Sequence, residues 1–252
     1  KIYSLAGKLP KHGGLIADPP FRNPHHSAST EGLIGGGKPI VPGEISLAHN
    51  GVLFLDEAPE FHKNILQSLR EPIERGRVDI ARAGSTFWFP ARFQLLLAAN
   101  PCPCGNLGKD DAVCICSLAE IRRYWRRLGG ALLDRIDIRI PVKPVDPDII
   151  INDEPESSEM VRQRVRDAVQ IQKRRFKEKG ILRNSHISPA DIHEFCSLSQ
   201  EASLVFSKAI KHLSLSSRAC HSVLRISRTT ADLEPSEKIQ KYHLLEAVQH
   251  RR

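Results

Sequence analysis

The chain has 252 residues, with 37 Lys and Arg against 29 Asp and Glu, so its formal net charge is +8. A basic balance of this size favours a polyanionic partner such as nucleic acid. No apolar run reaches the ~20 residues that a membrane span needs, and the N-terminal stretch lacks the apolar region of a signal peptide. We therefore expect a cytoplasmic protein that does not cross a membrane.

The first 50 residues contain many glycines and prolines and show little hydrophobic periodicity. This pattern predicts ordered loops or an insertion, without a core of its own. The stretch Gly35–Lys38 resembles a phosphate-binding loop only in its glycines, because Pro39 stands where Ser or Thr is required. No G-x-x-x-x-G-K-[ST] motif occurs anywhere in the chain.

Two apolar runs predict buried strands that end on polar side chains. The run "GVLFL" (51–55) is followed by Asp56 and Glu57, and "FQLLLAAN" (93–100) ends on Asn100. Ligands of open α/β sheets bind outside the carboxyl ends of the strands, so these three side chains are candidates for a site. The alternative is that the strands simply reach the surface there and their polar ends are solvated.

Other elements of the first part follow from periodicity and from the positions of Gly and Pro. The pattern predicts a helix over 59–76 that Pro72 interrupts, a hairpin over 77–93 that turns at Gly84-Ser85, and a basic helix over 118–128. Four prolines with acidic residues between them, from Pro141 to Pro155, indicate a linker.

Beyond the linker, the pattern is helical throughout. One helix is expected to begin after Ser157 or Ser158, and another is expected to be capped by Ser188. Two more are predicted over 216–233 and 236–249. The sequence therefore predicts an α/β part to about residue 145, followed by a small helical bundle.

Four of the six cysteines lie close together in two C-x-C pairs, Cys102 with Cys104 and Cys114 with Cys116. Four thiolates fill a tetrahedral zinc site, which makes a structural zinc ion our interpretation of this loop. The spacing differs from the commoner C-x-x-C, so free or redox-active thiols remain the alternative. The other two cysteines fall on apolar helical faces and are predicted to be core residues.

Several long motifs in this order carry a family resemblance: "PFRNPHHSAS", "PGEISLAHNGVLFLDEAPEF", "PARFQLLLAANPCPCG", "LLDRIDI" and "LSSRACHSVLRISRTTADL". Together they resemble the magnesium-chelatase-like AAA+ ATPases, specifically the competence protein ComM group, also called YifB. The resemblance covers nearly the whole chain. It implies an α/β fold, a partial AAA+ P-loop NTPase core with a parallel sheet, flanking helices and hairpin insertions, followed by a small all-α lid domain.

The resemblance also implies the domain boundaries. The ATPase core, without its Walker A motif, is expected over 1–145, with helix-2-type insertion loops at 1–50, a pre-sensor hairpin at 76–93 and the cysteine loop at 102–116. A linker at 146–157 and a C-terminal helical lid domain at 158–252 follow. The chain is expected to begin after the phosphate-binding loop, and to be inactive in ATP hydrolysis by itself.

Site residues follow from the same resemblance, position by position. Asp56 matches the Walker B residue that holds Mg²⁺ through water, and Glu57 the residue that polarises the attacking water. Asn100 matches sensor 1, which contacts the γ-phosphate. Arg135 matches the arginine finger that reaches the nucleotide of the next subunit, although an ion pair with a neighbouring Asp is the ordinary alternative. Arg218 matches sensor 2; Asp56, Asn100 and Arg218 are thus the expected Mg²⁺ and ATP contacts.

For the partner, the resemblance implies a homo-hexameric ring that acts on branched or single-stranded DNA, by branch migration or as a helicase, in recombination during natural transformation. Arg77 and Arg82 of the hairpin are candidate phosphate contacts, and the aromatic residues 87–89 are candidates for base stacking or hairpin packing. His25 and His26 are expected to anchor a loop or face the pore rather than bind a metal.

Two other functions fit parts of the pattern. One is a chelatase-type ATPase subunit that drives metal insertion into a porphyrin. The other is a non-catalytic, zinc-containing nucleic-acid-binding module, which the missing phosphate-binding loop keeps open.

Overall fold

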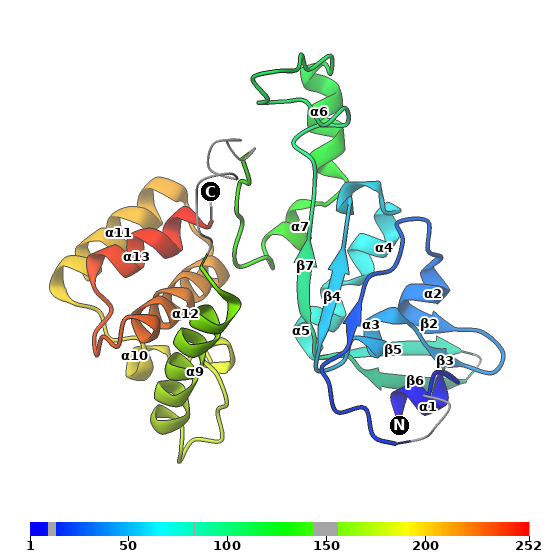
Figure 1. Cartoon of the computed structure of the whole chain (residues 1–252), viewed down its shortest axis with the longest axis horizontal. Coiled ribbons are helices and arrows are strands. Elements are labelled where there is room, and N and C mark those ends of the chain that lie inside the picture. The colour runs from blue at the N-terminus through cyan, green and yellow to red at the C-terminus, as the bar shows by residue number, and fades with distance from the viewer. Residues whose placement is uncertain (10–13, 83, 144–155, 252) are drawn as a thin grey trace. The chain divides into compact units, whose positions relative to one another are not determined.

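A computed structural model of the chain describes residues 1–9, 14–82, 84–143 and 156–251. These residues form two compact units, Lys1–Arg135 and Ile136–Arg252, whose elements are labelled in Figure 1. Residues 136–143, which we expected in the α/β part, group with the second unit. Of the expected linker, only 156 and 157 lie within the described residues.

A parallel three-stranded sheet forms the centre of the first unit, in the order β1 (Phe21–Arg22), β4 (Val52–Leu55) and β7 (Gln94–Leu97). In the register, Leu55 of β4 lies opposite Leu97 of β7. Because the strands are parallel, their carboxyl ends meet at one edge of the sheet. The predicted strands at 51–55 and 93–100 are therefore present, but the second covers only Gln94–Leu97 and is partly exposed rather than buried, with Leu96 42% exposed. Strand β1, at two residues, was not predicted.

A kinked pair of helices covers this sheet, α4 (Lys63–Ser68) and α5 (Arg70–Arg75). The break falls just before Pro72, as predicted, because proline has no N–H to bond the carbonyl of Ser68 and its ring clashes with that carbonyl. The predicted hairpin is formed by β5 (Arg77–Arg82) and β6 (Ser85–Pro90).

The remaining elements of the first unit are short, apart from one helix. They are α1 (Ile2–Leu5), α2 (Thr30–Ile34), β2 (Gly35–Gly36), β3 (Val41–Pro42), α3 (Glu44–Leu47), η1 (Ala58–Glu60), α6 (Leu118–Arg126) and α7 (Gly130–Leu133). The longer helix, α6, begins where predicted because Ser117 and Glu120 form a capping box at its N-terminus.

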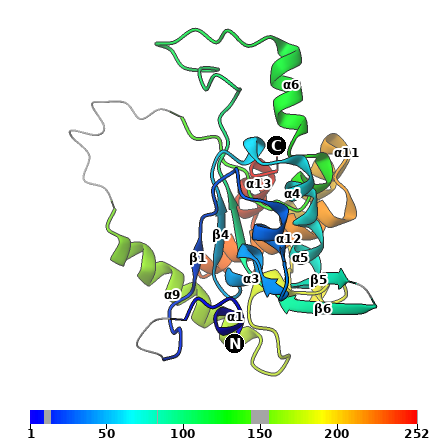
Figure 2. The same cartoon turned by 90° about the vertical axis from the view of Figure 1, so that its right-hand side faces the viewer.

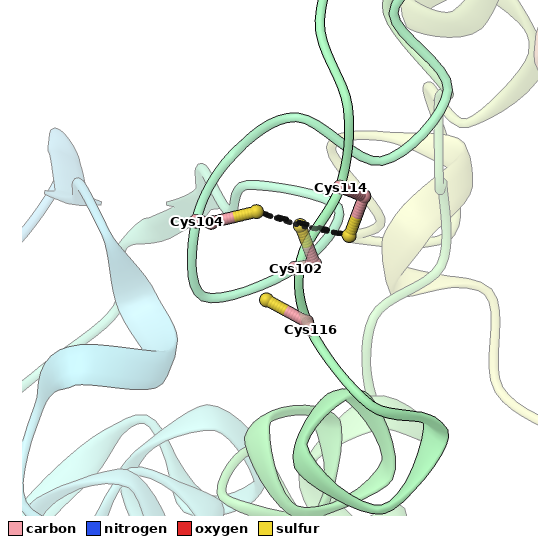
Figure 3. Close-up of side chains that lie close together, drawn as sticks. All are labelled: Cys102, Cys104, Cys114 and Cys116. Atoms are coloured by element: carbon pink, nitrogen blue, oxygen red, sulfur yellow. Dashed lines mark hydrogen bonds between the residues drawn. The ribbon is translucent and has the colours of Figure 1, made fainter.

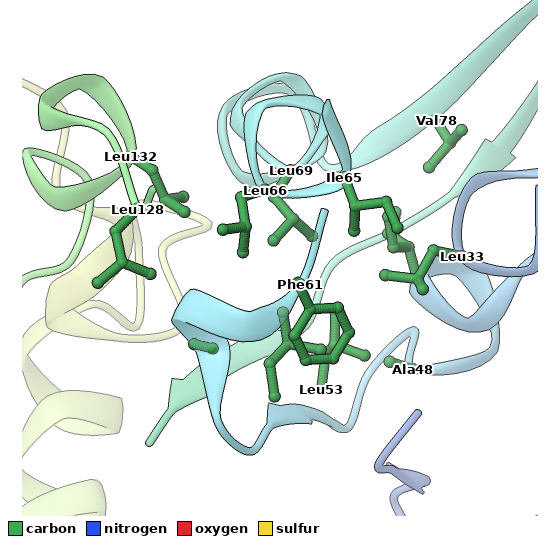
Figure 4. Packing of buried hydrophobic residues seen from close by; sticks show 14 residues of the cluster. Leu33, Ala48, Leu53, Phe61, Ile65, Leu66, Leu69, Val78, Leu128 and Leu132 are labelled. Atoms are coloured by element: carbon green, nitrogen blue, oxygen red, sulfur yellow. The ribbon is translucent and has the colours of Figure 1, made fainter. Parts of the chain in front are cut away.

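The hydrophobic core of the first unit includes residues from the first 50, the region expected to be ordered loops or an insertion. Leu33 and Ile45 are fully buried and pack in one cluster with Leu53 of β4 and with Phe61. Figure 4 shows Leu33, Leu53 and Phe61 within this cluster. Each such side chain contributes about 1.5–3 kcal/mol by its burial. The first 50 residues thus help to hold β4 in place by joining the core of the first unit.

The second unit is helical, as predicted. Its elements are α9 (Ser158–Arg175), η2 (Asn184–His186), α10 (Ile192–Phe195), α11 (Gln200–Leu213), α12 (Ser217–Leu233) and α13 (Lys241–Gln249). Helix α10 begins later than the predicted cap at Ser188, whose hydroxyl accepts the N–H of Asp191 in a preceding turn. Val223 of α12 and Leu244 of α13 are fully buried in the core of this unit.

A buried charged network joins three elements of the second unit. The carboxylate of Asp232 in α12 accepts hydrogen bonds from Arg228 (3.1 Å), from Asn184 (2.7 Å) and from both terminal nitrogens of Arg175. The side chains of Asp232 and Arg228 are 0% and 1% exposed. The network therefore fixes α12 against α9 and η2.

Within the part of the chain that the structure describes, no helix combines the length and the apolar character that a membrane span requires.

Candidate functional site

Polar side chains follow all three strands at the carboxyl edge of the sheet. His26 lies beyond β1, Asp56 and Glu57 follow β4, and Asn100 lies beyond β7. Backbone pairing continues past the strand ends, since the N–H of Ala98 donates to Leu55 (3.0 Å) and the N–H of Ala58 to Ala98 (2.8 Å). The segments after β4 and β7 are thus held side by side.

Glu57 adopts a left-handed backbone conformation, with φ 49° and ψ 43°. Its N–H donates to Oδ1 of Asp56 at 2.9 Å, and the buried Ala58 then begins η1. The turn keeps both carboxylates exposed while the chain beyond them returns to the core. Exposed carboxylate oxygens at a sheet edge suit a hydrated Mg²⁺ ion, which keeps several of its waters when bound.

His26, which was expected to anchor a loop or face the pore, lies at this edge beside Glu57. Its Nδ1 lies 3.4 Å from Oε2 of Glu57, and its ring stands edge-on to the buried Phe61, at 6.4 Å between centroids. His25 packs against His26, with ring centroids 4.1 Å apart. The pair therefore anchors the loop after β1 to the carboxylate edge, which is one of the two roles expected for it, whereas its partner Glu57 was not predicted.

Arg135 follows α7 and is largely buried, with a side chain 12% exposed. Its Nη2 lies 2.6 Å from Oε1 of Glu74 in α5, and its Nη1 donates to the carbonyl of Ala131. Its buried Nε has no hydrogen-bond acceptor among the described residues. To act as the expected arginine finger in a neighbouring subunit's site, Arg135 would therefore have to break its ion pair with Glu74.

Arg218 lies in the first turn of α12, where Ser216 caps the helix by accepting the N–H of Ala219 at 3.2 Å. Its side chain is exposed. A guanidinium in this place suits phosphate oxygens, since it stays charged and carries several donors.

The β5–β6 hairpin exposes part of its aromatic cluster. Trp88 is 61% exposed and Phe87 43%, whereas Phe89 is only 8% exposed and packs toward the core. Arg82 donates to the carbonyl of Gly37 in the β2–β3 turn, which ties the two hairpins together. Arg77 Nε lies 3.1 Å from the carboxylate of Asp79. Trp88 and Phe87 thus remain accessible to a partner, and Phe89 serves packing.

The four clustered cysteines converge as Figure 3 shows. Their sulfur atoms all lie within 4.8 Å of one another, and Cys102 to Cys104, Cys102 to Cys114 and Cys104 to Cys114 are 3.4, 3.6 and 3.7 Å apart. A hydrogen bond from the backbone of Asn106 lowers the pKa of the Cys104 thiol to about 6. Four sulfurs at these separations fit around one tetrahedral metal ion. Elsewhere in the described residues, no other His, Cys, Asp and Glu side chains gather in this way.

Comparison with known proteins gives one consistent family. The family model described as magnesium chelatase, subunit ChlI, matches residues 1–150, and the model of the C-terminal part of the same subunit matches residues 155–251. The chain is 43% identical over 236 residues to the uncharacterized protein YifB of Escherichia coli, which is 92% of this chain and 45% of that protein. It is also 43% identical over 235 residues to the competence protein ComM of Haemophilus influenzae, again 92% of this chain and 45% of that protein. The chain thus spans less than half the length of these relatives.

Proposed function

Because this chain belongs to the magnesium chelatase ChlI family, in the group of YifB and ComM, we propose that it forms the Walker B, sensor and lid parts of an ATP-hydrolysing ring motor that acts on DNA. The observation that carries the proposal is the carboxyl edge of the sheet, where Asp56, Glu57 and Asn100 follow adjacent parallel strands.

In this proposal each side chain has a separate task in phosphoryl transfer, which depends on positioning and on charge neutralisation. Asp56 holds the water shell of Mg²⁺, which supplies the positive charge that the phosphates need. Glu57 accepts a hydrogen bond from the attacking water and polarises it. Asn100 donates its side-chain amide to a γ-phosphate oxygen or to that water.

Two arginines complete the proposed site. Arg218 contacts the nucleotide from the lid, and Arg135 acts on the nucleotide of a neighbouring subunit, so that the active form is a homo-hexamer. The described geometry adds one requirement, since Arg135 must exchange Glu74 for a phosphate. The chain contains no Walker A motif, and we propose that the 252 residues alone do not hydrolyse ATP.

DNA as the partner is supported by the net charge of +8 and by the name of the Haemophilus influenzae relative, competence protein ComM. Arg77 and Arg82 are the proposed phosphate contacts, and the exposed Trp88 is the proposed base-stacking side chain. Branch migration or helicase action is the corresponding activity.

We also propose a structural zinc ion in the site of Cys102, Cys104, Cys114 and Cys116. The support is the mutual approach of the four sulfurs within 4.8 Å. Thiolates persist in a reducing compartment, which fits a cytoplasmic protein. Elemental analysis of the purified chain is expected to give about one zinc per chain. A zinc-free protein purified under reducing conditions would favour free thiols instead.

A second function, ATP-driven metal insertion into a porphyrin, is favoured by the name of the matching family model. One experiment distinguishes this function from the DNA motor. It uses an extended protein in which a phosphate-binding loop precedes residue 1. We expect its ATPase rate to rise with branched or single-stranded DNA. A rate that does not respond to DNA, but rises with a porphyrin and its partner subunit, would establish the chelatase function. A nucleic-acid-binding protein with no ATPase activity in this extended form would establish the non-catalytic module.

A further inference from the structure

The cysteine cluster begins two residues after Asn100. Cys102 is fully buried, and its Sγ accepts the N–H of Leu107 at 3.4 Å. Two residues span at most about 7 Å of extended chain, so whatever fixes Cys102 also limits where the backbone of Asn100 lies. The cluster is thus attached directly to the carboxyl end of β7.

A second attachment to the same segment comes from α6. The indole Nε1 of Trp125 donates to the carbonyl of Pro101 at 3.1 Å. Tyr124, the neighbouring residue, is 5% exposed. Burial raises the pKa of its phenol, as does the charge of Glu60. The indole of Trp125 therefore ties α6 to Pro101, the residue that follows Asn100.

The cluster and the helix are also joined to each other. Cys116 is followed at once by Ser117, whose hydroxyl and backbone N–H both lie 2.8 Å from Oε2 of Glu120 in the capping box of α6. The chain therefore forms a closed circuit, from Cys102 through the four sulfurs to Cys116, along α6 to Trp125 and back to Pro101. Figures 1 and 2 show the cysteine loop and α6 projecting together at one end of the first unit.

Apolar packing does not hold this circuit together. Val113, just before the second C-x-C pair, and Ile115, the middle residue of that pair, are 82% and 85% exposed, and Leu118 at the start of α6 is 73% exposed. A short loop without a core of its own depends on cross-links or metal for its structure.

From these contacts we infer that the four-cysteine site is a positioning element for Asn100, in which a bound zinc ion closes the circuit and Trp125 of α6 holds Pro101. This inference rests on the proposed zinc ion and on the proposed role of Asn100. Zinc loss opens the circuit at the sulfurs, and residues 100–102 then keep the contact of Pro101 with Trp125 and the local hydrogen bonds of Cys102 with Gly105 and Leu107. Trp125 is a positioning residue for Asn100 and does not itself contact the nucleotide.

Hydrogen exchange of the 252-residue chain tests the inference without any activity measurement. Removing zinc with a chelator is expected to raise exchange at least about 10-fold in peptides covering 94–102 and 117–126, and one equivalent of zinc is expected to restore it. Peptides covering 52–58 are expected to keep their rates. Cys104→Ser is expected to show the zinc-free pattern from the start. The matched control is Cys220→Ser, which replaces a cysteine outside the cluster and is expected to behave as wild type.

The fluorescence of Trp125 provides a second measurement, because the chain has only two tryptophans. In a Trp88→Phe background, zinc removal is expected to shift the Trp125 emission to longer wavelength as the indole loses its contact with Pro101. Trp125→Phe is expected to retain zinc yet raise hydrogen exchange at 94–102. This result would separate the effect of the contact between Trp125 and Pro101 from the effect of metal binding.

Three results would overturn the inference, each in a different way. If zinc is released and hydrogen exchange at 94–102 does not change, the proposal that the cysteines bind zinc stands, but its link to Asn100 is refuted. Exchange that rises across the whole first unit would make zinc a general folding element. A chain that binds no zinc would remove the zinc proposal and the positioning with it, while leaving the roles of Asp56 and Glu57 to their own tests.

Kinetics in the extended protein then distinguish positioning from stability. A 1 Å displacement of a catalytic group costs up to about 100-fold in rate. Trp125→Phe is therefore expected to lower kcat by about 10- to 100-fold with little change in KM for ATP. An equal effect on KM, or an unchanged kcat, would contradict the positioning role.

Discussion

Replacing Asp232 by asparagine tests the buried network that holds α12, the helix whose first turn carries Arg218. Asp232 has a fully buried side chain, and it is the carboxylate partner of both Arg228 and Arg175. The amide preserves the shape of the side chain but removes its charge, so the 1% exposed guanidinium of Arg228 loses its counter-ion.

The expected loss follows from what remains bonded. Breaking one partner of a buried pair costs about 3–5 kcal/mol. Arg228 keeps hydrogen bonds to the carbonyls of Glu237 and Ser236, and Arg175 is 18% exposed, which places the loss near the lower end, at about 3 kcal/mol. The control is Glu194→Gln, which breaks a pair with Lys179 whose side chains are 48% and 51% exposed, and which costs below about 1 kcal/mol.

Hydrogen exchange of α12 peptides is the suitable assay, because two compact units need not unfold in one transition. A loss of about 3 kcal/mol corresponds to roughly a 100-fold loss of protection, since about 1.4 kcal/mol is tenfold. Peptides covering β4 are expected to keep their protection. Equal effects of Asp232→Asn and Glu194→Gln would refute the reasoning, as would a loss for Asp232→Asn below about 1 kcal/mol.

Three further predictions concern function. In the extended protein, Glu57→Gln is expected to retain ATP binding while turnover falls by at least about 100-fold, because the amide cannot polarise the water; normal turnover would contradict the assignment. Arg135→Ala is expected to lower turnover by about 10³-fold, and mixing with Glu57→Gln subunits is expected to restore part of it; no recovery in mixed rings would argue against action on a neighbour's site. Arg77→Ala and Arg82→Ala are each expected to reduce the slope of log affinity for DNA against log salt by about one, whereas Lys208→Ala on α11 leaves it unchanged; identical slopes for all variants would exclude the hairpin contacts.

Local signals account for the elements that the sequence predicted well. The strand at 51–55 is a short apolar run, and the hairpin turns at a glycine with φ of 81°. The capping box at Ser117 marks the beginning of α6. Each of these signals lies within a few residues of the element that it specifies.

The sequence did not reveal features that depend on distant partners. Strand β1 has two residues and exists only because it pairs with β4. Leu33 sits in a Gly-rich stretch and is buried by residues from β4 and α4, which no local pattern shows. The contacts of His26 with Glu57 and of Arg135 with Glu74 likewise join residues far apart in the chain. Of the candidate site, the residue types were predictable, but their partners were not.

The left-handed backbone at Glu57 has a consequence for the local stability of the chain at this position. An ordinary L-residue in that conformation is destabilised by about 1–2 kcal/mol, and glycine is not. Glycine at this position would avoid that cost, but it would lose about 0.5–1 kcal/mol because it increases the conformational entropy of the unfolded chain. Glutamate is therefore a poorer choice for folding at residue 57 than glycine. Selection for stability alone would favour glycine at residue 57. With glutamate, the protein has a carboxylate at this position and a lower local stability.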